Sequence, residues 1–411
     1  MIYKYEHPEY FSNIPQPDYE KYNGKIVIFG AGVNGAILLA LLKKKNIDTL
    51  CFVDDDIRKC GTEYFGYPVL SREKLYELYN DVVILVTPYI AGTIFEKLRD
   101  AGYQEVYDCS PLFLEFDMEE VKEYISPILD VFHCVQTFLN KRSYINNITT
   151  VNHALTVVIT ERCTLSCREC MAFVPYYEKP ADYSFNELSI ALDNILPTGV
   201  FPDIYLEGGE PFLHKDFQKI LAKLISFKEV KHIWIITNGT IVPSEEILKS
   251  LITPKVIVWI SDYGKNSYKM GELKEILRIK GITHHSTTQH WYKVTNAYKF
   301  NRSNEATQEV YDSCCKGLHA MNPFLIKGRI YRCQFHARTE EFGIIPKCCS
   351  DSIDALHDKE SLKDRLQSFF FRKDYLEACN YCTGRGYTSV EVPVAEQTDG
   401  KLMHLQKINM D

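Results

Sequence analysis

Strands and helices alternate along most of this chain of 411 residues, and no other feature restricts its fold as strongly. In the central part, short apolar runs typical of buried strands lie at residues 155–160, 204–206, 233–236, 256–260 and 282–285. The stretches between them repeat apolar residues at helical spacing. A crossover helix returns the chain to the same end of the sheet, so consecutive strands run parallel. Residues 151–312 are therefore predicted to form an open or closed (β/α) barrel in an α/β fold.

A shorter alternation of the same kind precedes the barrel. An apolar strand at residues 25–29 leads into Gly30, Gly32 and Gly35 and then into an apolar helix, and the next strand ends at Asp54. Strand, glycine turn and helix in this order are the context that the dinucleotide-binding fingerprint requires, with an acid further on for the ribose. Residues 1–110 are predicted to be a Rossmann-like domain that binds a nucleotide, a nucleotide-sugar or NAD at these four residues, or that serves only as a scaffold. Residues 111–150 are expected to be a helical connector.

Composition excludes several classes of partner. The 47 basic and 54 acidic side chains give a net charge of −7, which argues against nucleic-acid binding. The longest apolar run near the N-terminus, residues 36–42, cannot span a bilayer, and nothing there resembles a signal peptide. We expect a cytoplasmic protein with no membrane partner. The 14 cysteines then favour metal or redox chemistry over disulfides.

Cys163, Cys167 and Cys170 follow the first barrel strand in a C-x3-C-x2-C pattern. Three thiolates on one loop can hold a four-iron cluster with one iron left open to a ligand, and zinc is the alternative metal. Polar or glycine residues also follow the next three strands, where barrel enzymes keep their catalytic groups. They are Gly208, Gly209, Glu210 and Pro211 after the second strand, Asn238 after the third and Ser261 after the fourth.

In this order and combination, these motifs resemble the radical S-adenosylmethionine (SAM) superfamily over roughly residues 151–300. The resemblance implies a partial (β/α)6 barrel and a [4Fe–4S] cluster on the three cysteines, with SAM on the fourth iron. It also implies a reducing partner such as flavodoxin or ferredoxin. The methionyl amine of SAM would lie at the glycine motif that ends in Pro211, the methionine end near Asn238 and the ribose near Ser261. Glu169 departs from the family, in which the residue before the third cysteine is often aromatic and packs near adenine.

Residues 313–411 are predicted to form a small cysteine-rich domain with an auxiliary cluster. Four cysteines there are enough to complete a second [4Fe–4S] cluster, or a zinc knuckle, and they are Cys315, Cys333, Cys379 and Cys382. Cys314 is an alternative to Cys315, and two short strands are expected around Lys327 and Gly328. The arrangement resembles the twitch form of the SPASM-like auxiliary module of radical SAM dehydrogenases.

These resemblances imply a radical SAM oxidoreductase, a dehydrogenase or an epimerase, that acts on a small-molecule substrate. Residues 52–56 and 66–70 resemble the N-terminal domains of surface-polysaccharide enzymes, so the expected substrate is a carbohydrate or a nucleotide-linked sugar. His285 is the candidate base, and Cys348 or Cys349 would return a hydrogen atom in an epimerase. A SPASM-type peptide maturase and a non-catalytic iron–sulfur electron carrier are the alternatives.

Overall fold

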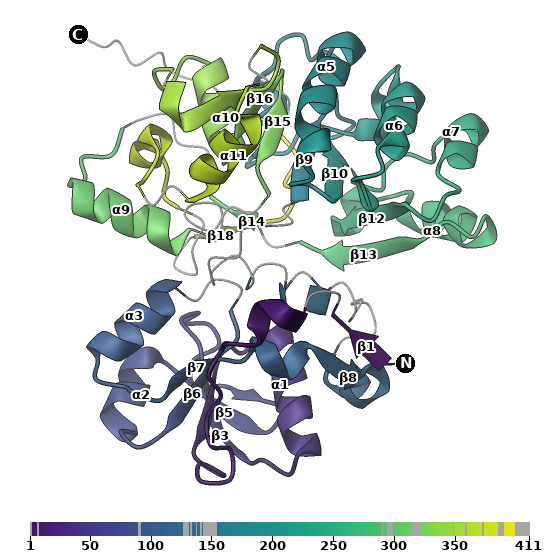
Figure 1. The fold of residues 1–411 in the computed structure, drawn as a ribbon. Helices are drawn as coiled ribbons and strands as arrows, with labels where there is room; N and C mark the ends of the chain where they lie inside the picture. The colour runs from purple at the N-terminus through teal and green to yellow at the C-terminus, as the bar shows by residue number, and fades with distance from the viewer. Residues whose placement is uncertain are drawn as a thin grey trace. The chain divides into compact units, whose positions relative to one another are not determined.

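The computed structural model describes residues 2–5, 8–88, 92–125, 131, 134–136, 138–139, 142, 154–289, 291–293, 299–314, 322–347, 349–357, 360–371, 374–384 and 390–398. The chain forms two compact units, residues 1–151 and residues 152–411 (Figure 1). The first unit contains both the expected Rossmann-like domain and the expected connector. The second contains both the expected barrel and the cysteine-rich region. The finer domain boundaries stay a prediction.

The N-terminal unit is built on a six-stranded sheet in the order β4-β5-β3-β2-β6-β7. Its strands are β2 (Ile26–Phe29), β3 (Thr49–Val53), β4 (Glu63–Tyr64), β5 (Tyr67–Leu70), β6 (Val83–Val86) and β7 (Val106–Asp108). All neighbours are parallel except β4 and β5. The chain moves outward from β2 to β5 and then returns to the other side of β2, so the strand order reverses between β2 and β6. β1 (Ile2–Lys4) and β8 (Glu115–Asp117) form a separate antiparallel pair.

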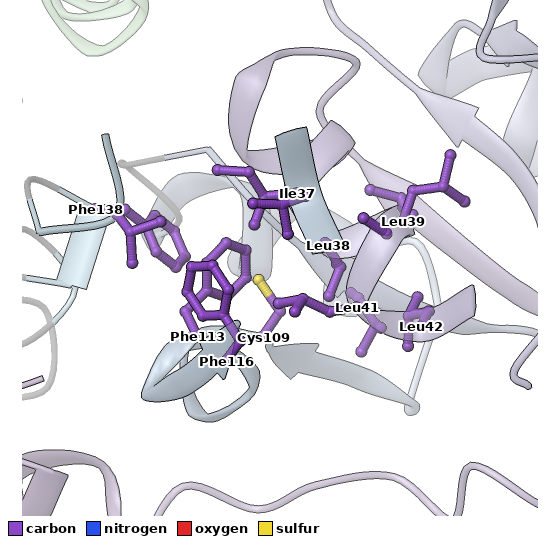
Figure 2. Close-up of a cluster of buried hydrophobic side chains, with 14 of the residues drawn as sticks. Ile37, Leu38, Leu39, Leu41, Leu42, Cys109, Phe113, Phe116 and Phe138 are labelled. Carbon is purple, nitrogen blue, oxygen red and sulfur yellow. The ribbon is translucent and has the colours of Figure 1, made fainter. Parts of the chain in front are cut away.

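Both faces of this sheet are covered, because successive residues of a strand point to opposite faces. The helices are α1 (Val33–Lys44), α2 (Arg72–Leu78) and α3 (Gly92–Asp100). Ile26 and Ile28 of β2 belong to one apolar cluster with α1, whereas Val27 and Phe29 belong to another with α2 and α3. Figure 2 shows α1 side chains of the first cluster with Cys109 and with three aromatic rings from later in the chain, Phe113, Phe116 and Phe138. Residues of the expected connector therefore complete the core of this unit.

The C-terminal unit contains an eight-stranded sheet in the order β13-β12-β11-β10-β9-β15-β16-β17. Five strands form its parallel part, β9 (Ala154–Val158), β10 (Asp203–Glu207), β11 (His232–Thr237), β12 (Val256–Asp262) and β13 (His284–Thr288). The helices between them are α5 (Phe185–Ile195), α6 (Phe217–Ser226), α7 (Glu245–Ser250) and α8 (Met270–Ile279), which Figure 1 shows along this part of the sheet. The alternation predicted from the sequence is confirmed. Ser184 caps α5, and its hydroxyl accepts a hydrogen bond from Glu187 N at 3.4 Å.

The sheet differs from a regular six-stranded barrel in where its sixth parallel strand lies. β15 (Phe324–Ile326) is parallel to β9, at the start of the barrel, and does not follow β13. β15, β16 (Arg329–Tyr331) and β17 (Ser352–Asp354) continue the sheet as antiparallel neighbours, so the cysteine-rich region shares a sheet with the barrel. The hairpin predicted around Lys327 and Gly328 is confirmed, and both residues have the positive φ that a two-residue turn of this kind requires.

The remaining elements of the C-terminal unit are short. β14 (Trp291–Tyr292) pairs antiparallel with β18 (Glu391–Val392) in a small second sheet. The helices are α9 (Asn304–Ser313), α10 (Gln334–Glu341) and α11 (Leu362–Phe371). Within the ranges that the structure describes, no helix combines the length and the apolar character that a membrane span needs.

Candidate functional site

The cysteines of the C-x3-C-x2-C pattern lie together in the loop after β9. All three contact one small apolar cluster centred on Leu165, Cys167 and Ala395, which Tyr263 and Trp291 also join. Burial raises the pKa of the Tyr263 phenol, and the nearby side chains of Cys170, Cys167 and Cys163 raise this pKa further. The Tyr263 side chain therefore lies near all three thiols. The loop therefore brings the three thiols of the pattern to one small cluster.

N–H groups donate to two of these sulfurs. Leu165 N lies 3.4 Å and Asn238 Nδ2 lies 3.5 Å from Cys163 Sγ, and Gln397 Nε2 lies 3.1 Å from Cys167 Sγ. Such donors stabilise the negative charge of a thiolate that ligates a metal, and they tune the cluster that the thiolates hold. A buried thiol without a metal is neutral, since burial raises the pKa of Cys163 and of Cys167 to about 12. A metal must therefore displace their protons when it binds.

The chemistry of the donor set is that of an iron–sulfur site. Among the described residues, no group of three or more His, Cys, Asp or Glu side chains is placed to hold one metal ion. Thiolates are the usual protein ligands of a four-iron cube, which takes one at each coordinated iron. The donor set, three thiols with N–H groups aimed at sulfur, thus fits a [4Fe–4S] cluster that leaves one iron to another ligand.

Gly208 and Gly209 are required by the backbone of the cysteine loop. A Cβ on Gly208 would lie 2.7 Å from Thr160 O, and a Cβ on Gly209 would lie 2.3 Å from Arg162 O and 2.8 Å from Cys163 Cβ. Gly209 N donates to Thr160 O at 2.9 Å, and Glu210 N donates to Arg162 O at 2.8 Å. The N–H groups of Gly209 and Glu210 are therefore hydrogen-bonded within the protein. Through these bonds the glycine motif fixes the segment that leads into Cys163, and we call this contact the brace.

Glu210 is fully buried, and its carboxylate binds the end of the neighbouring strand. Thr237 Oγ1 donates to both carboxylate oxygens at 3.0 Å, and Asn238 N donates to one of them at 2.9 Å. Burial raises the pKa of Glu210 to about 7, against these hydrogen bonds, which lower it. Pro211 is buried and begins a 3₁₀ turn, Pro211–Leu213, that Glu210 caps. The side chain expected to meet the amine of SAM therefore joins the ends of β10 and β11.

Asn238 and Ser261 lie next to the cysteine loop. Asn238 donates to Thr164 Oγ1 at 3.1 Å as well as to Cys163, and its Oδ1 accepts from Thr240 N at 3.0 Å. Ser261 is 5% exposed and hydrogen-bonds the Tyr263 side chain. Both residues are thus at the expected end of the sheet, with Asn238 in direct contact with a ligand thiol. Tyr263, Trp291 and Gln397 also belong to the site, and the sequence prediction did not single them out as site residues.

His285 belongs to an aromatic stack on one face of the barrel sheet. Tyr205 pairs with Trp234 and Trp259 pairs with His285 across neighbouring strands, so all four share a face. The rings of Tyr205 and Trp234 stack at 6.0 Å, and those of Trp234 and His285 stack at 6.1 Å. Glu207 and Ser261 lie on the same face by alternation. Ile204, Leu206, Val258 and Ile260 have the opposite parity and are fully buried.

Three of the four cysteines predicted to hold an auxiliary cluster lie together. Cys333, Cys379 and Cys382 contact one apolar cluster, and burial with the charges of Cys333 and Cys382 raises the pKa of Cys379. Gly384 N donates to Cys382 Sγ at 3.3 Å, and Arg302 donates to the carbonyl of Cys382 at 2.7 Å. Cys315 and Cys348 lie outside the described residues, as does the side chain of Cys349. Cys314 follows α9 and is partly buried.

Phe173 links the cysteine loop to the core around the C-terminal cysteines. It lies three residues after Cys170 and belongs to the same apolar cluster as Cys333, Cys379 and Cys382, whereas the thiols of the loop contact another cluster. Its ring packs against Phe335 of α10 at 6.0 Å and against Phe342 at 5.9 Å. Cys333 immediately precedes α10, and six of the helix's eight residues, Gln334 to Thr339, are buried. The buried helix α10 thus begins next to Cys333 and packs against Phe173.

In the N-terminal unit, three of the four residues predicted to bind a nucleotide, Gly30, Gly35 and Asp54, make close contacts within the protein. A Cβ on Gly30 would lie 2.4 Å from Thr87 Oγ1, and a Cβ on Gly35 would lie 2.0 Å from Gly30 O, whereas one on Gly32 would meet open space. Asp54 is 5% exposed and accepts hydrogen bonds from Ala31 N at 2.8 Å and Asp56 N at 2.9 Å. Its carboxylate also pairs with Lys59 at 3.0 Å. The acid expected to bind ribose therefore ties the glycine turn to β3.

Two family models match separate parts of the chain. Residues 22–106 match the family described as C2185-like, N-terminal, and residues 157–261 match the Radical SAM superfamily. All three cysteines of the loop after β9, and the glycine motif with Glu210, lie within the second match.

Curated relatives are similar over short stretches. The mitochondrial GTP 3',8-cyclase of Arabidopsis thaliana is 37% identical over 87 residues, which is 21% of this chain and 22% of that protein. The S-adenosylmethionine-dependent nucleotide dehydratase of Selenomonas ruminantium is 28% identical over 90 residues, 22% of this chain and 31% of that protein. This chain therefore matches less than a third of the length of either relative.

A solved structure of BtrN in complex with AdoMet and 2-DOIA is similar to this chain with a TM-score of 0.37 and 13% identity. The match covers 61% of this chain and 99% of BtrN, and a likeness at this level carries no argument about activity. The family-model match includes the three cysteines, the glycine motif with Glu210, Asn238 and Ser261. Over residues 157–261, this chain is similar to the Radical SAM superfamily.

Proposed function

We propose that this radical SAM enzyme oxidises a carbohydrate or a nucleotide-linked sugar, with Cys163, Cys167 and Cys170 as ligands of a [4Fe–4S] cluster and SAM on the open iron. The supporting observation is the set of three thiols with N–H donors on two of its sulfurs, braced by Gly209 and Glu210. When bound, the cluster and SAM supply the electron and the radical that removes a hydrogen atom from the substrate. A flavodoxin or ferredoxin is the proposed reductant.

The chain's own residues bind and orient SAM in this proposal. The backbone carbonyl groups of Gly208 and Gly209, at the end of β10, are the proposed partners of the methionyl amine, since the Glu210 carboxylate is engaged by Thr237 and Asn238. Ser261 is the proposed contact of the ribose. Tyr263 and Trp291, whose rings meet edge to face at 5.5 Å beside the thiols, are the proposed aromatic neighbours of the adenine in place of Glu169.

The substrate is proposed to lie on the sheet face that carries Tyr205, Trp259 and His285. Aromatic rings suit the apolar faces of sugars and the planes of nucleobases, and a neutral imidazole such as that of His285 can accept a proton from a hydroxyl group. Removal of a hydrogen atom from carbon, of the hydroxyl proton by His285 and of one further electron completes a two-electron oxidation. The two relatives described above carry nucleotides or GTP in their names, which favours a nucleotide-linked substrate.

The further electron is proposed to pass to an auxiliary [4Fe–4S] cluster in a twitch-like module. Cys333, Cys379 and Cys382 are its proposed ligands, with Cys315 or Cys314 as the fourth. The supporting observation is that these thiols share one apolar cluster with Phe173, next to the first set of cysteines. An epimerase would instead need a thiol that returns a hydrogen atom, for which Cys348 and Cys349 stay the predicted candidates.

The N-terminal unit is proposed to be a Rossmann-like domain that binds a nucleotide or nucleotide-sugar at the start of α1. Gly32 begins α1 with no side-chain cap and faces open space, and helix N-termini attract phosphate groups. Asn34 Oδ1, in the first turn, is buried and has no hydrogen-bond partner among the described residues. It can accept a hydrogen bond from a ligand hydroxyl. Calorimetric titration of the protein with UDP-sugars and NAD tests this proposal, and no heat with either would contradict it.

Anaerobic reconstitution, followed by iron and sulfide counting and an assay of 5'-deoxyadenosine with dithionite, tests the central proposal. Two complete clusters correspond to about eight irons per chain. Cys167→Ala should abolish deoxyadenosine formation, whereas Cys60→Ala, a matched control thiol in the N-terminal unit, should leave it unchanged. Deoxyadenosine formation by Cys167→Ala at the wild-type rate would refute the cluster assignment.

The auxiliary cluster and the oxidation are tested separately. Cys382→Ala should keep SAM cleavage and lose the oxidised product, and zinc in place of iron at the C-terminal cysteines would overturn the electron-acceptor role. UDP-sugars deuterated at single carbons should transfer deuterium to 5'-deoxyadenosine from one position only. Transfer of the deuterium to 5'-deoxyadenosine, with a solvent-derived hydrogen returned to the same carbon in inverted configuration, would show an epimerase instead.

A further inference from the structure

The chain segment from Ala395 to Thr398 lies beside the cysteine loop, although more than two hundred residues separate them. Arg168 N donates to Glu396 O and Thr398 N donates to Ser166 O, both at 2.8 Å, and Cys167 and Gln397 form an antiparallel bridge. These contacts place the side chain of Gln397 directly against the middle cysteine of the three.

The Gln397 side chain uses both ends of its amide. Its Oε1 accepts a hydrogen bond from Ser166 N at 2.8 Å, and its Nε2 donates to Cys167 Sγ at 3.1 Å and to Ala395 O at 2.8 Å. The acceptor end therefore fixes the orientation of the amide, and the donor end points at sulfur. This is also the shortest of the N–H to sulfur distances given above for the loop.

The segment is held in place independently of Gln397. Ala395 is fully buried with φ +50°, and its carbonyl accepts a hydrogen bond from Asn266 Nδ2 at 2.8 Å. Further back, β18 pairs with β14, and Lys293 N donates to Val390 O at 2.9 Å. A substitution at Gln397 thus removes the donor on sulfur and leaves several other attachments of the segment.

We infer that Gln397 is a positioning residue that tunes the reduction of the cluster on Cys163, Cys167 and Cys170. The inference rests on the proposed function, since it needs a cluster on these thiols. Reduction adds an electron to the cluster and increases the negative charge on its sulfurs, so an N–H donor stabilises the reduced form more than the oxidised form. Gln397 therefore raises the reduction potential of the cluster, so that the cluster more readily accepts the electron needed to cleave SAM.

The test is a redox titration of the reconstituted full-length protein, followed by electron paramagnetic resonance of the signal that changes when SAM is added. Gln397→Leu removes the donor without adding charge, and we expect the reduction potential of the cluster to become more negative. A tenfold fall in the equilibrium constant for reduction corresponds to about 59 mV for one electron. Gln397→Glu keeps an acceptor for Ser166 N and should shift the potential in the same direction. Iron content should equal that of the wild type in both variants.

Asn266→Ala is the matched control, because it loosens the same segment at Ala395 and keeps the donor on Cys167. Its potential should equal that of the wild type. An unmoved potential in Gln397→Leu, or an equal shift in Asn266→Ala, would overturn the tuning role while leaving the proposed function intact. A wild-type protein that takes up no iron would overturn the proposed function and this inference together.

Discussion

The two units of the molecule have similar packing at a strand end, but only the C-terminal unit places three thiols beside it. In each, a parallel strand leads into glycines whose Cβ positions are blocked by backbone or neighbouring side chains, Gly209 in one unit and Gly35 in the other. In each, a buried acid, Glu210 or Asp54, accepts hydrogen bonds from backbone N–H groups. In the C-terminal unit this brace fixes a loop with three thiols. In the N-terminal unit it fixes the start of a helix beside Gly32.

The comparison teaches that glycines and an acid after a strand are evidence of close backbone packing before they are evidence of a ligand. What separates the two units is the group that the packed backbone supports. Cys163 follows directly from Arg162, whose carbonyl receives Glu210 N. The corresponding contacts of Asp54 end on Ala31, whose side chain is a methyl group, and on Asp56, whose carboxylate pairs with Arg58.

The largest effect is expected for Gly209→Ala. The new methyl group would lie 2.3 Å from Arg162 O and would displace Cys163, so cluster uptake and deoxyadenosine formation should fall to background. Overpacking of this kind also costs about 3 kcal/mol of stability. Iron counting and hydrogen exchange of peptides from the C-terminal unit measure the two effects. A variant with full iron content would show that the loop adapts and that the brace is dispensable.

Glu210→Gln should change how stability depends on pH. The folded pKa of about 7 exceeds the unfolded value of about 4.5, so the folded protein binds more protons between these values and the wild type loses stability as pH rises through this range. The neighbours Thr237, Asn238 and Phe212 carry no charge, and Cys163, with a pKa of about 12, stays neutral.

Relative to the wild type, cluster-free Glu210→Gln should therefore gain about 2 to 3 kcal/mol in the free energy of unfolding between pH 5 and pH 8. Denaturant unfolding of both proteins at each pH, with hydrogen exchange to assign the loss to the C-terminal unit, measures the difference. Parallel stability curves for the two proteins would mean that the carboxylate is ionised and well solvated.

Asp54→Ala is the matching substitution in the N-terminal unit. It leaves two backbone N–H groups, of Ala31 and Asp56, without their acceptor and should destabilise that unit by about 2 kcal/mol. Faster hydrogen exchange in peptides from β2 and β3, with exchange in the C-terminal unit unchanged, is the expected observation. If Asp54→Ala left the stability of the unit unchanged but weakened nucleotide binding, Asp54 would instead be a ribose ligand.

The smallest effect on stability is expected for Gly32→Ala. The position has extended backbone angles and no neighbour within 4 Å of a new Cβ, so the fold should change in stability by less than about 0.5 kcal/mol. A methyl group there would nevertheless block close approach of a phosphate to the start of α1. Affinity for a nucleotide-sugar should thus fall at least tenfold by calorimetry, and retained affinity would place the ligand elsewhere.

Local patterns predicted the elements well because their causes are local. The apolar strand β3, residues 49–53, ends directly before Asp54 as predicted, since a strand buried on both faces is apolar throughout. The cap of α5 by Ser184 is equally local, because its hydroxyl needs only a backbone N–H three residues away. The thiols of Cys163, Cys167 and Cys170 were predictable for the same reason, since one loop carries all three.

Contacts between distant segments were not predictable from such patterns. The sequence around residue 324 indicates a short strand, but nothing in it names β9 as its partner. Gln397 carries no motif, and its contact with Cys167 depends on where β18 places the end of the chain. The contacts of Glu210 were not predictable because an acid after a strand can serve a ligand or a neighbouring strand equally well, and the contact with Thr237 and Asn238 becomes visible only in the structure.

The position of β15 has a consequence for synthesis on the ribosome. β9, which leads into the cysteine loop, has β10 on one side, and its other edge stays unpaired until residues 324–326 have been translated. An apolar edge strand left open in a nascent chain is a site for wrong pairing and aggregation. Premature termination before residue 324 should therefore yield insoluble fragments.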